Sequence, residues 1–410
     1  MKIVVTTSTF PMHPDDKIPD FVYQQLLALK KFDPEISFIV HAPYNYLSES
    51  SARDCGAFVR FYKESRFHYF LPRRLELVAG GGIMSTLRSK PWSAATLPFF
   101  LAFHLISLYL LVKKEKPEIL YAHWFTPQAI SSAIVSKLTA TPFVFTTHAS
   151  DVSVLGNIPF SKAMVRAVCR RASAYTAVSK KTSSKLKRFF TNLEWENEFK
   201  QKLAVIPMGI VMPNRRQKYP RDRGLTTILF LGRFVEKKGV DFLLKSVLML
   251  SRSKDVRLVL AGNGPEFASY KNLVKEFGIE SIVEFVGFVK DRRKEQLLLE
   301  ADIVCIPSVD TSSGDEEGMP VVLMEALAVG AVVVATTSSG ADEYLKDGFN
   351  GYLVPGGDHA ALCQKLREVI DESPNRLSVV SYEAYNTSRL FDWELLVWSY
   401  RDLLGKRGLD

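Results

Sequence analysis

The stretch DTSSGDEEGMPVVLMEALAVG, residues 310–330, decides how this sequence folds. It predicts a polar loop, a helix and a turn into the buried strand pattern AVVVAT at residues 331–336. Pro320 suits the first helical position, because its missing N–H has no intrahelical partner there and its φ is already helical. Gly330 suits the left-handed residue that follows a helix.

Two glutamates bracket the start of this helix. Glu317 lies in the loop just ahead of it, and Glu325 falls in its second turn. The unpaired N–H groups and the macrodipole of a helix start favour an anion, most naturally a phosphate. Carboxylates instead accept hydrogen bonds from sugar hydroxyls. The stretch therefore indicates a ligand that is part phosphate and part polyol. The competing interpretation is an acidic loop that caps an ordinary buried helix.

Strand and helix patterns alternate along the chain on both sides of this stretch. Short apolar runs such as KIVVT at residues 2–6 and VRLVL at residues 256–260 are typical of strands buried on both faces. Alternation of this kind predicts α/β domains with parallel sheets and right-handed crossovers. No G-x-G-x-x-G follows the first strand, which disfavours a nicotinamide-dependent oxidoreductase.

The chain divides into two such series. Residues 211–225 are rich in Pro, Gly and charge and predict a linker. We expect a Rossmann-like domain over residues 1–210, a second over residues 226–390, and a cleft between them. Residues 391–410 predict an amphipathic helix that crosses back to the first domain. Its apolar side chains must pack outside their own series; they are Trp393, Leu396, Trp398 and Leu403.

Charge and cysteine usage bound the partners and the compartment. The net charge of +9 is uneven, since residues 1–210 carry +12 and the remainder −3. Between Val152 and Leu193 there are nine basic residues and no acidic one. Such a field suits an anionic partner or serves solubility. Nucleic acid is disfavoured because no recognised binding motif accompanies it. Four scattered cysteines and the absence of a signal pattern predict a cytoplasmic protein.

The most apolar stretch, AATLPFFLAFHLISLYLLV at residues 94–112, has three interpretations. Its 19 residues fall within the ~17–25 that a membrane span needs. Pro98, His104 and Tyr109, and the strand pattern that follows at once, argue against a span. The alternatives are a buried domain helix and a helix that dips into a membrane surface.

Cations and glycines gather at the predicted sheet edges. Gly232 and Arg233 end the first strand of the second series, and Lys238 follows just before a helix, so both cations can contact a phosphate. Gly264 belongs to a second loop at the same edge. In the first series, His123 and His148 lie at or just past strand ends, where open parallel sheets bind ligands. Either histidine could equally be structural.

The motifs in the second half resemble those of a retaining glycosyltransferase of family 4, with the GT-B fold. They are GRFVEKKGVDFLLKSV, LVLAGNGPE, VEFVGFV, ADIVCIPS and EGMPVVLMEALAVG, in order and at family spacing. The first half agrees through AHWFTP, TTHASDV, TAVSKKT and VIPMGI. YFLPRRLELVAGGGI with the apolar stretch is similar to transferases of exopolysaccharide, colanic-acid and capsule assembly.

The resemblance implies a role for each matched residue. Arg233 and Lys238 would bind the diphosphate of a nucleotide-sugar donor, Glu317 the hydroxyls of its sugar, and Glu325 those of its ribose. His148 would contact the sugar from the facing domain. The remaining donor contacts would come from the loop at Phe288, Gly264 and the backbone of Met319, Pro320, Val321 and Val322. Weaker candidates for acceptor contact are Asp151, His123, Gly81 and Gly82.

The predicted activity is transfer of a sugar, with retention, to a lipid-linked or growing glycan of cell-surface polysaccharide. The diphosphate leaves beside fixed cations and a helix start, so no metal or other cofactor is required. We expect peripheral membrane contact through the basic first domain. Alternatives are a small soluble acceptor such as a sugar phosphate, and a non-catalytic nucleotide- or glycan-binding protein. The sequence departs from relatives at residues 8–11, at Ala149 and at Pro320, where glycine is common.

Overall fold

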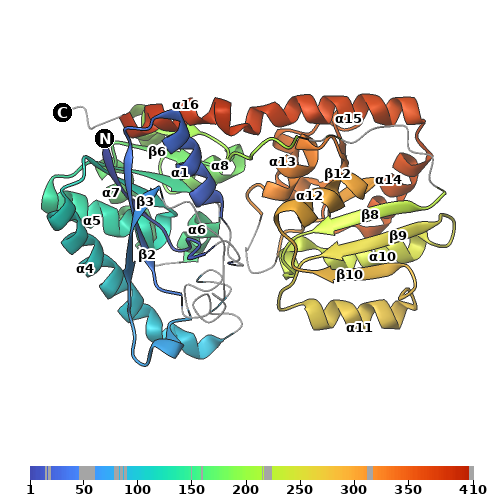
Figure 1. The fold of residues 1–410 in the computed structure, drawn as a ribbon, viewed down its shortest axis with the longest axis horizontal. Helices are drawn as coiled ribbons and strands as arrows, with labels where there is room; N and C mark the ends of the chain where they lie inside the picture. Colours follow the sequence, from blue (N-terminus) through green and yellow to red (C-terminus); the bar gives the residue numbers. More distant parts are fainter. Residues whose placement is uncertain are drawn as a thin grey trace. The chain divides into compact units, whose positions relative to one another are not determined.

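The computed structural model describes residues 1–13, 16, 20–45, 61–77, 83, 86, 90–148, 150–157, 160–214, 216, 224–311 and 317–405. The chain forms two compact units (Figure 1). Unit 1 consists of Met1–Gly209 and Trp393–Asp410, and unit 2 of Ile210–Asp392. Each unit is built on one parallel sheet, which confirms the predicted fold class of two Rossmann-like domains.

Unit 1 holds a seven-stranded sheet in the order β3-β2-β1-β4-β5-β6-β7. Its central strands β4, β5 and β6 are fully buried between two helical layers, because a parallel sheet is covered on both faces. The strands are β1 (Lys2–Thr6), β2 (Ser37–Pro43), β3 (Tyr62–Phe67), β4 (Ile119–His123), β5 (Phe143–Thr147), β6 (Ala174–Ala177) and β7 (Leu203–Val205).

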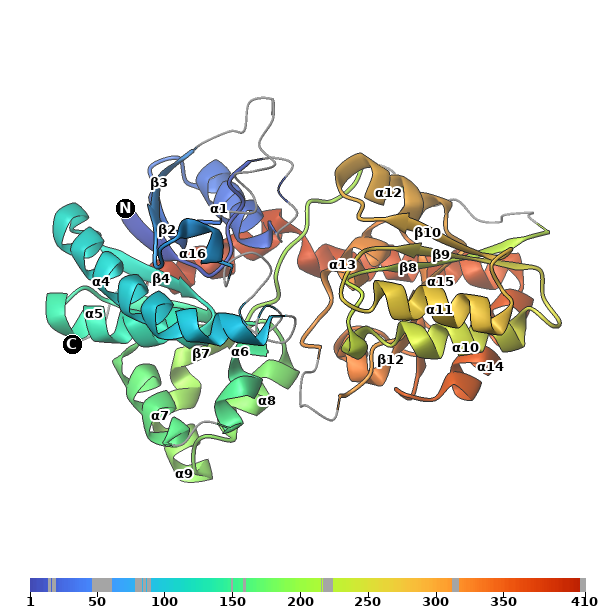
Figure 2. The same cartoon turned by 90° about the horizontal axis from the view of Figure 1, so that it is seen from below.

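Two separate clusters of apolar side chains cover the faces of this sheet. One face carries α1 (Phe21–Phe32) and α16 (Trp393–Gly405), and the other carries α4 (Leu97–Glu115), α5 (Ile130–Thr139) and α7 (Ser161–Arg171). Figure 2 shows α4 and α5 side by side. The shorter helices are α6 (Ser150–Ser153), α8 (Lys180–Lys187) and α9 (Asn192–Glu194).

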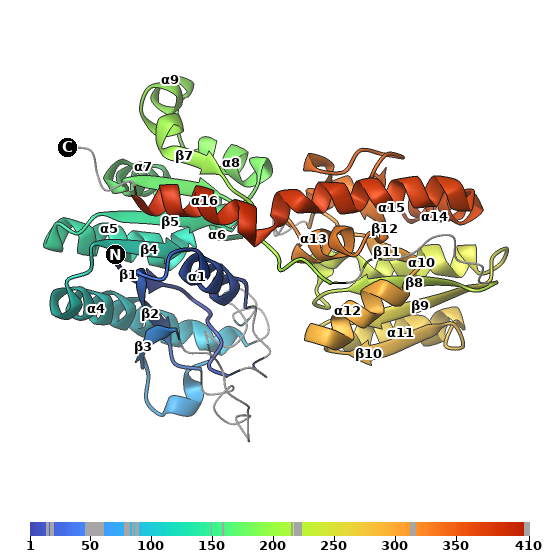
Figure 3. The ribbon, with the colours of Figure 1, turned by 45° about the horizontal axis from the view of Figure 1, so that its top comes forward.

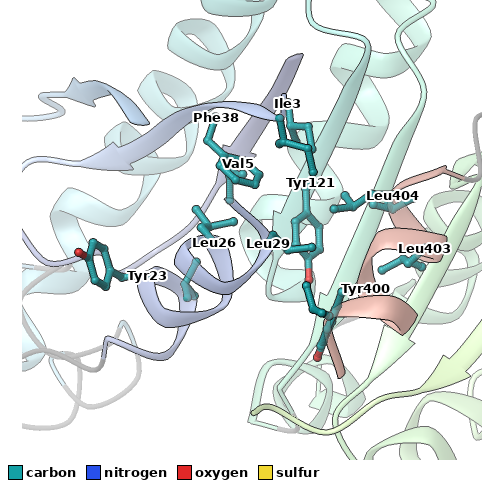
Figure 4. Packing of buried hydrophobic residues seen from close by; sticks show 14 of the residues in the cluster. Ile3, Val5, Tyr23, Leu26, Leu29, Phe38, Tyr121, Tyr400, Leu403 and Leu404 are labelled. Atoms are coloured by element: carbon teal, nitrogen blue, oxygen red, sulfur yellow. The ribbon is translucent and has the colours of Figure 1, made fainter. Parts of the chain in front are cut away.

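The C-terminal helix α16 completes the core of unit 1. Figure 4 shows Tyr400, Leu403 and Leu404 beside Tyr121 and side chains of α1. The Tyr400 hydroxyl lies 3.2 Å from the carbonyl oxygen of Ile206 and 3.1 Å from that of Pro207. Among the four side chains predicted to pack, three are buried. Trp398 is 64% exposed, although its ring meets Phe32 edge-on at 4.3 Å.

Strand β3 is absent from the sequence-based prediction. Its sequence YKESRF contains no apolar run. In the structure only Tyr62 and Phe67 are buried, and the four residues between them are at least partly exposed. An edge strand needs one paired side and little burial, so tertiary pairing with β2 outweighs its weak pattern.

Unit 2 holds a six-stranded sheet in the order β10-β9-β8-β11-β12-β13. Its core has one layer formed mainly by α10 (Val240–Leu250) and α14 (His359–Asp371), with a smaller part from α11 (Phe267–Phe277). The other layer is formed mainly by α12 (Asp291–Glu300) and α13 (Val321–Ala328). The strands are β8 (Thr226–Leu231), β9 (Val256–Ala261), β10 (Val283–Gly287), β11 (Ile303–Ile306), β12 (Val332–Thr336) and β13 (Tyr352–Val354).

The helices of unit 2 include two that the sequence-based prediction missed, α14 and α15, although both have a side-chain cap. Asp358 accepts hydrogen bonds from the N–H groups of Ala360 and Ala361, and Ser373 accepts one from Arg376. Figure 3 shows α15 beside α13. The helices are α10 (Val240–Leu250), α11 (Phe267–Phe277), α12 (Asp291–Glu300), α13 (Val321–Ala328), α14 (His359–Asp371) and α15 (Pro374–Ser388).

Of the two predicted ends of α13, one is confirmed and the other is wrong. Gly330 has a φ of +70° just past the helix, as expected. Pro320 is the N-cap with a ψ of 126°, so it lies one residue ahead of the first helical position. Its extended conformation turns the preceding loop away from the helix axis.

Candidate active site

In unit 2, the loop that carries Lys238 is pressed against the loop that follows β11. Gly239 has a φ of +62°, and a Cβ there would lie 2.0 Å from the carbonyl oxygen of Pro307. The backbone N–H of Val309 donates to the carbonyl of Lys237 at 2.9 Å. A residue with a side chain at position 239 would separate these loops. The glycine thus brings the loop of Lys238 to the stretch that leads into α13.

This approach joins one predicted cation to one predicted acid. Lys238 Nζ lies 2.7 Å from Glu317 Oε2, and each side chain is about 15% exposed. Such a partly buried ion pair is weakly screened and stays reachable for a ligand. Arg233 belongs to the same loop, and its side chain is exposed. The structure therefore brings Lys238 and Glu317 into contact. Arg233 lies five residues before Lys238 in the same loop.

The second glutamate has a partner that the sequence did not reveal. Glu325 Oε1 lies 2.6 Å from Lys294 Nζ of α12. Lys294 is 31 positions away in the chain and lies among other charged residues of an exposed helix. Its only signal in the sequence is a positive charge, which many exposed positions share.

The start of α13, with Pro320 as its N-cap, follows Glu317 by three residues and presents backbone N–H groups. Met319 is buried, and Val321 and Val322 are partly exposed at the first turn. The N-cap is a proline, and no side chain of the described residues caps this helix. Its first N–H groups are therefore available to an anion, and the dipole of this eight-residue helix favours a negative charge there.

The other predicted donor contacts differ in their surroundings. A Cβ on Gly264 would lie 2.2 Å from the carbonyl oxygen of Phe234. Close packing against the loop of Phe234 is therefore enough to require glycine there. Phe288 follows β10 and is 47% exposed. Its exposed ring can stack on a planar group.

Unit 1 brings its two predicted histidines together at the carboxyl edge of its own sheet. His123 Nδ1 lies 3.2 Å from His148 Nε2, and the rings stack with an interplanar angle of 27°. Burial lowers the pKa of His148 to about 3 and that of His123 well below its usual value. Both imidazoles are therefore neutral at physiological pH.

Asp151 positions the loops that carry these histidines. Its two carboxylate oxygens accept hydrogen bonds from the N–H groups of Phe125, at 2.6 Å, and His148, at 3.0 Å. Burial raises the pKa of Asp151 to about 6, and these hydrogen bonds oppose the rise. The carboxylate links the ends of β4 and β5.

Polar atoms at the end of β4 and just after it add to the site, and the sequence analysis missed two of the residues that carry them, Thr126 and Gln128. His123 Nε2, Thr126 Oγ1 and Gln128 Oε1 are buried and have no hydrogen-bond partner among the described residues. Gln128 Nε2 donates to Ser8 Oγ at 2.7 Å. Buried polar atoms are normally satisfied, so a hydroxyl-rich ligand would suit this loop. Its signal was the polar segment TPQ directly after the strand end AHWF.

Some predicted features are not located. Gly81 and Gly82 lie outside the described residues, as do residues 215 and 217–223 of the predicted linker. Where the structure describes the chain, no three His, Cys, Asp or Glu side chains gather as metal ligands.

The fold and these clusters define a class: GT-B proteins, with two Rossmann-like domains and polar loops at the sheet edges. Two family models match the chain, "Glycosyl transferases group 1" over residues 211–387 and "Glycosyl transferase 4-like" over residues 76–179. Over these residues the chain is similar to glycosyltransferases of group 1 and of family 4.

Curated relatives agree over part of the chain. The putative colanic acid biosynthesis glycosyltransferase WcaL of Salmonella typhimurium is 33% identical over 41% of this chain and 42% of its own length. The amylovoran biosynthesis glycosyltransferase AmsK of Erwinia amylovora is 36% identical over 34% of each chain. The chain thus matches about two fifths of WcaL and a third of AmsK.

Solved structures share the fold over almost the whole chain. HepE of Anabaena, solved in complex with UDP, matches with a TM-score of 0.71, 18% identity and coverage of 99% of this chain and 100% of its own. Sucrose-phosphate synthase of Thermosynechococcus elongatus matches with a TM-score of 0.71, 17% identity and the same coverage.

Proposed function

We propose that this protein is a retaining, metal-independent glycosyltransferase. It moves a sugar from a nucleotide-diphosphate sugar to a lipid-linked or growing glycan in cell-surface polysaccharide biosynthesis. The observation that carries the proposal is the contact of Lys238 with Glu317 beside the uncapped start of α13. One cation, one acid and a row of N–H groups match a ligand that joins a diphosphate to a sugar.

Each group in unit 2 has a part in this chemistry. When the bond between the anomeric carbon and the diphosphate breaks, negative charge grows on the diphosphate. Lys238, Arg233 and the N–H groups of Val321 and Val322 stabilise that charge without reorganisation. Glu317 accepts hydrogen bonds from sugar hydroxyls and holds Lys238 in place between turnovers.

The acceptor hydroxyl attacks the same face of the sugar that the diphosphate leaves. Its oxygen bonds to the anomeric carbon, and its proton passes to an oxygen of the departing diphosphate. No enzymatic nucleophile is needed, and the products are the glycoside with retained configuration and the nucleoside diphosphate. His148 contacts the transferred sugar in this proposal, and its neutral imidazole can donate or accept a hydrogen bond.

The nucleoside is held by a second group of residues. Glu325 accepts hydrogen bonds from the ribose hydroxyls, and Lys294 keeps it ionised and oriented. The exposed ring of Phe288 contacts the base. A donor of this kind agrees with the UDP that is bound in the HepE structure.

A lipid-linked acceptor would place the protein at the cytoplasmic face of a membrane, through its basic unit 1. Support comes from the names of relatives, which include a phosphatidyl-myo-inositol mannosyltransferase of Mycobacterium leprae, 34% identical over 42% of this chain. A small soluble acceptor is the second candidate, favoured by an N-acetyl-glucosaminyl malate synthase of Bacillus anthracis that matches 65% of this chain at 24% identity.

A thermal-shift panel tests the donor. UDP-, GDP- and ADP-sugars are added separately to the purified protein, and the one that binds the folded state raises its melting temperature. That donor is then incubated with membrane extract, and the anomeric configuration of the product is determined by NMR. A product of inverted configuration would contradict retention, and no shift with any nucleotide sugar would contradict the function.

A further inference from the structure

Helix α4 is built with its polar side chains inward. Over residues 91–112, the 3-10 turn Pro91–Thr96 and most of α4 contain no Lys, Arg, Asp or Glu. A surface helix normally turns its apolar stripe to the core and its polar residues to water. Here two polar residues in the uncharged part of the helix, His104 and Ser107, bond to residues of the sheet.

A hydrogen-bonded cluster fixes this orientation. Thr6 Oγ1 of β1 lies 3.0 Å from His104 Nε2 and 3.1 Å from His41 Nδ1. Ser107 Oγ lies 2.9 Å from His41 Nε2, and Ser131 Oγ of α5 lies 3.0 Å from His104 Nδ1. These bonds connect β1, β2 and α5 to α4, so the helix cannot rotate its other faces inward without breaking them.

The outward face carries large apolar side chains, which we call the α4 apolar face. Each is between 46% and 58% exposed in the structure. They are Trp92, Phe99, Phe103, Ile106 and Leu110. The helix has 19 residues and is therefore roughly 28 Å long. Monomeric soluble proteins rarely expose an apolar patch of such extent without a partner.

Basic residues lie at the ends of this face. Lys113, Lys114 and Lys116 are exposed at its carboxyl end, and Lys90 precedes Trp92 at the other. Tyr109 lies beneath Lys113, whose Nζ is 5.8 Å from the ring centroid. An apolar face rimmed by lysines with aromatic side chains near both ends suits the boundary between acyl chains and anionic headgroups.

We propose that α4 lies in the surface of an anionic lipid bilayer, parallel to it, with the α4 apolar face among the acyl chains. The proposal rests on the proposed function, because it names the element that makes the membrane contact of a transferase with a lipid-linked acceptor. The segment Pro91–Glu115 is long and apolar enough to cross a bilayer. It does not cross here, because Phe100, His104, Leu108 and Val112 are buried against unit 1.

Charge favours a bilayer over a second copy of the chain. The lysine rim is complementary to anionic headgroups, whereas another copy would present the same positive rim. The basic stretch before Leu193 is a weaker anchor than its sequence indicates. Arg166, Arg170 and Lys187 contact three glutamates that follow it, which are Glu194, Glu198 and Glu196.

Vesicle co-sedimentation tests the proposal. Wild type and a Phe103→Glu/Ile106→Glu double variant are mixed with vesicles of phosphatidylcholine and phosphatidylglycerol at about 0.1 M and about 1 M salt. Both replaced side chains are exposed, and a thermal melt verifies that the variant folds. Leu193→Glu, an exposed leucine of α9, is the matched control. We expect wild type and control to stay bound at high salt and the double variant to bind at least tenfold more weakly.

Each other outcome has one meaning. Binding that salt releases and the double variant leaves unchanged would overturn the role of α4 while keeping a basic membrane contact. A wild type that dimerises through this face, with a monomeric variant and no vesicle binding, would overturn the bilayer as its partner. Transfer to a detergent-solubilised acceptor should be equal in wild type and double variant. If neither transfers, the proposed function fails, whatever the vesicles show.

Discussion

The two sheet edges of this protein hold opposite kinds of polar group. At the edge of unit 2, Lys238 and Glu317 are ionised and in contact, and both stay partly exposed. At the edge of unit 1, His123 and His148 are stacked and neutral because burial lowers the pKa of each. Related folds thus provide one edge with fixed charges and another with neutral hydrogen-bonding groups.

The difference corresponds to the two ends of the proposed reaction. A diphosphate carries charge that must be balanced, and the ion pair and helix start of unit 2 supply that balance. Hydroxyl groups are neutral, and unit 1 offers buried neutral atoms such as Thr126 Oγ1 and Gln128 Oε1.

The largest expected effect is in unit 2. Lys238→Ala and Glu317→Ala should each lower kcat/KM for transfer at least about 100-fold, because each removes a charge placed at the breaking bond. The melting temperature should change little, since both side chains are partly exposed. Lys275→Ala, an exposed lysine on α11, is the control. A kcat/KM within threefold of wild type in either variant would contradict the assignment of the unit 2 edge as the charged end of the reaction.

Acidification should act on unit 1 before unit 2. Unfolded histidines bind a proton below about pH 6.5. The pKa of His104 is lowered to about 3 by burial, as is that of His148, so the folded unit binds fewer protons between these pH values. Stability is therefore lost as pH falls through this window, by roughly 2 kcal/mol per histidine at pH 5. The raised pKa of Asp151 acts in the opposite direction between about pH 4 and 6.

Calorimetry between pH 7 and pH 5 measures this effect. The transition of unit 1 should move to lower temperature more than that of unit 2, whose described part contains one histidine, His359, at the start of α14. His104→Gln should reduce the pH dependence of the unit 1 transition even if it lowers stability at pH 7. If the melting temperature of unit 1 depended on pH equally in this variant and in wild type, buried neutral histidines would not be the cause of the pH dependence.

A smaller effect is expected at the ribose. Glu325→Gln should raise the KM for the donor about tenfold and leave kcat nearly unchanged, because it weakens hydrogen bonds made equally in the ground state and transition state. Glu276→Gln, exposed on α11, is the control. A fall in kcat with constant KM would place Glu325 at the reacting centre with Glu317.

The sequence predicted what depends on local pattern. Buried strands such as β5 and β12 begin with the apolar runs FVF and VVVA, and Gly330 has the conformation that its position past a helix requires. The sequence analysis did not predict β3, because its pairing with β2 and not its composition makes it a strand. It did not predict the role of Lys294, because a contact with Glu325 across 31 positions produces no local sequence pattern.

The orientation of α4 shows a different limit. Its residues are apolar on nearly every side, so periodicity could not select a buried face, and three interpretations stayed open. The structure selects through His104 and Ser107, whose partners are Thr6, His41 and Ser131. The usual rule that polar residues face water would have predicted His104 and Ser107 on the exposed side of this helix, which is the opposite of the observed orientation.

Unit 1 is built from two segments of the chain, Met1–Gly209 and Trp393–Asp410, and this has a consequence for its synthesis. Its core includes Tyr400, Leu403 and Leu404 of α16, and the core residues outside that helix precede Ile210. A ribosome thus emits all of unit 2 before the helix that closes the first core becomes available. Until then, the apolar side of α1 around Leu26 and Leu29 has no cover from α16. The nascent chain must carry an unfinished first unit, open to chaperones and proteases, through almost half of its synthesis.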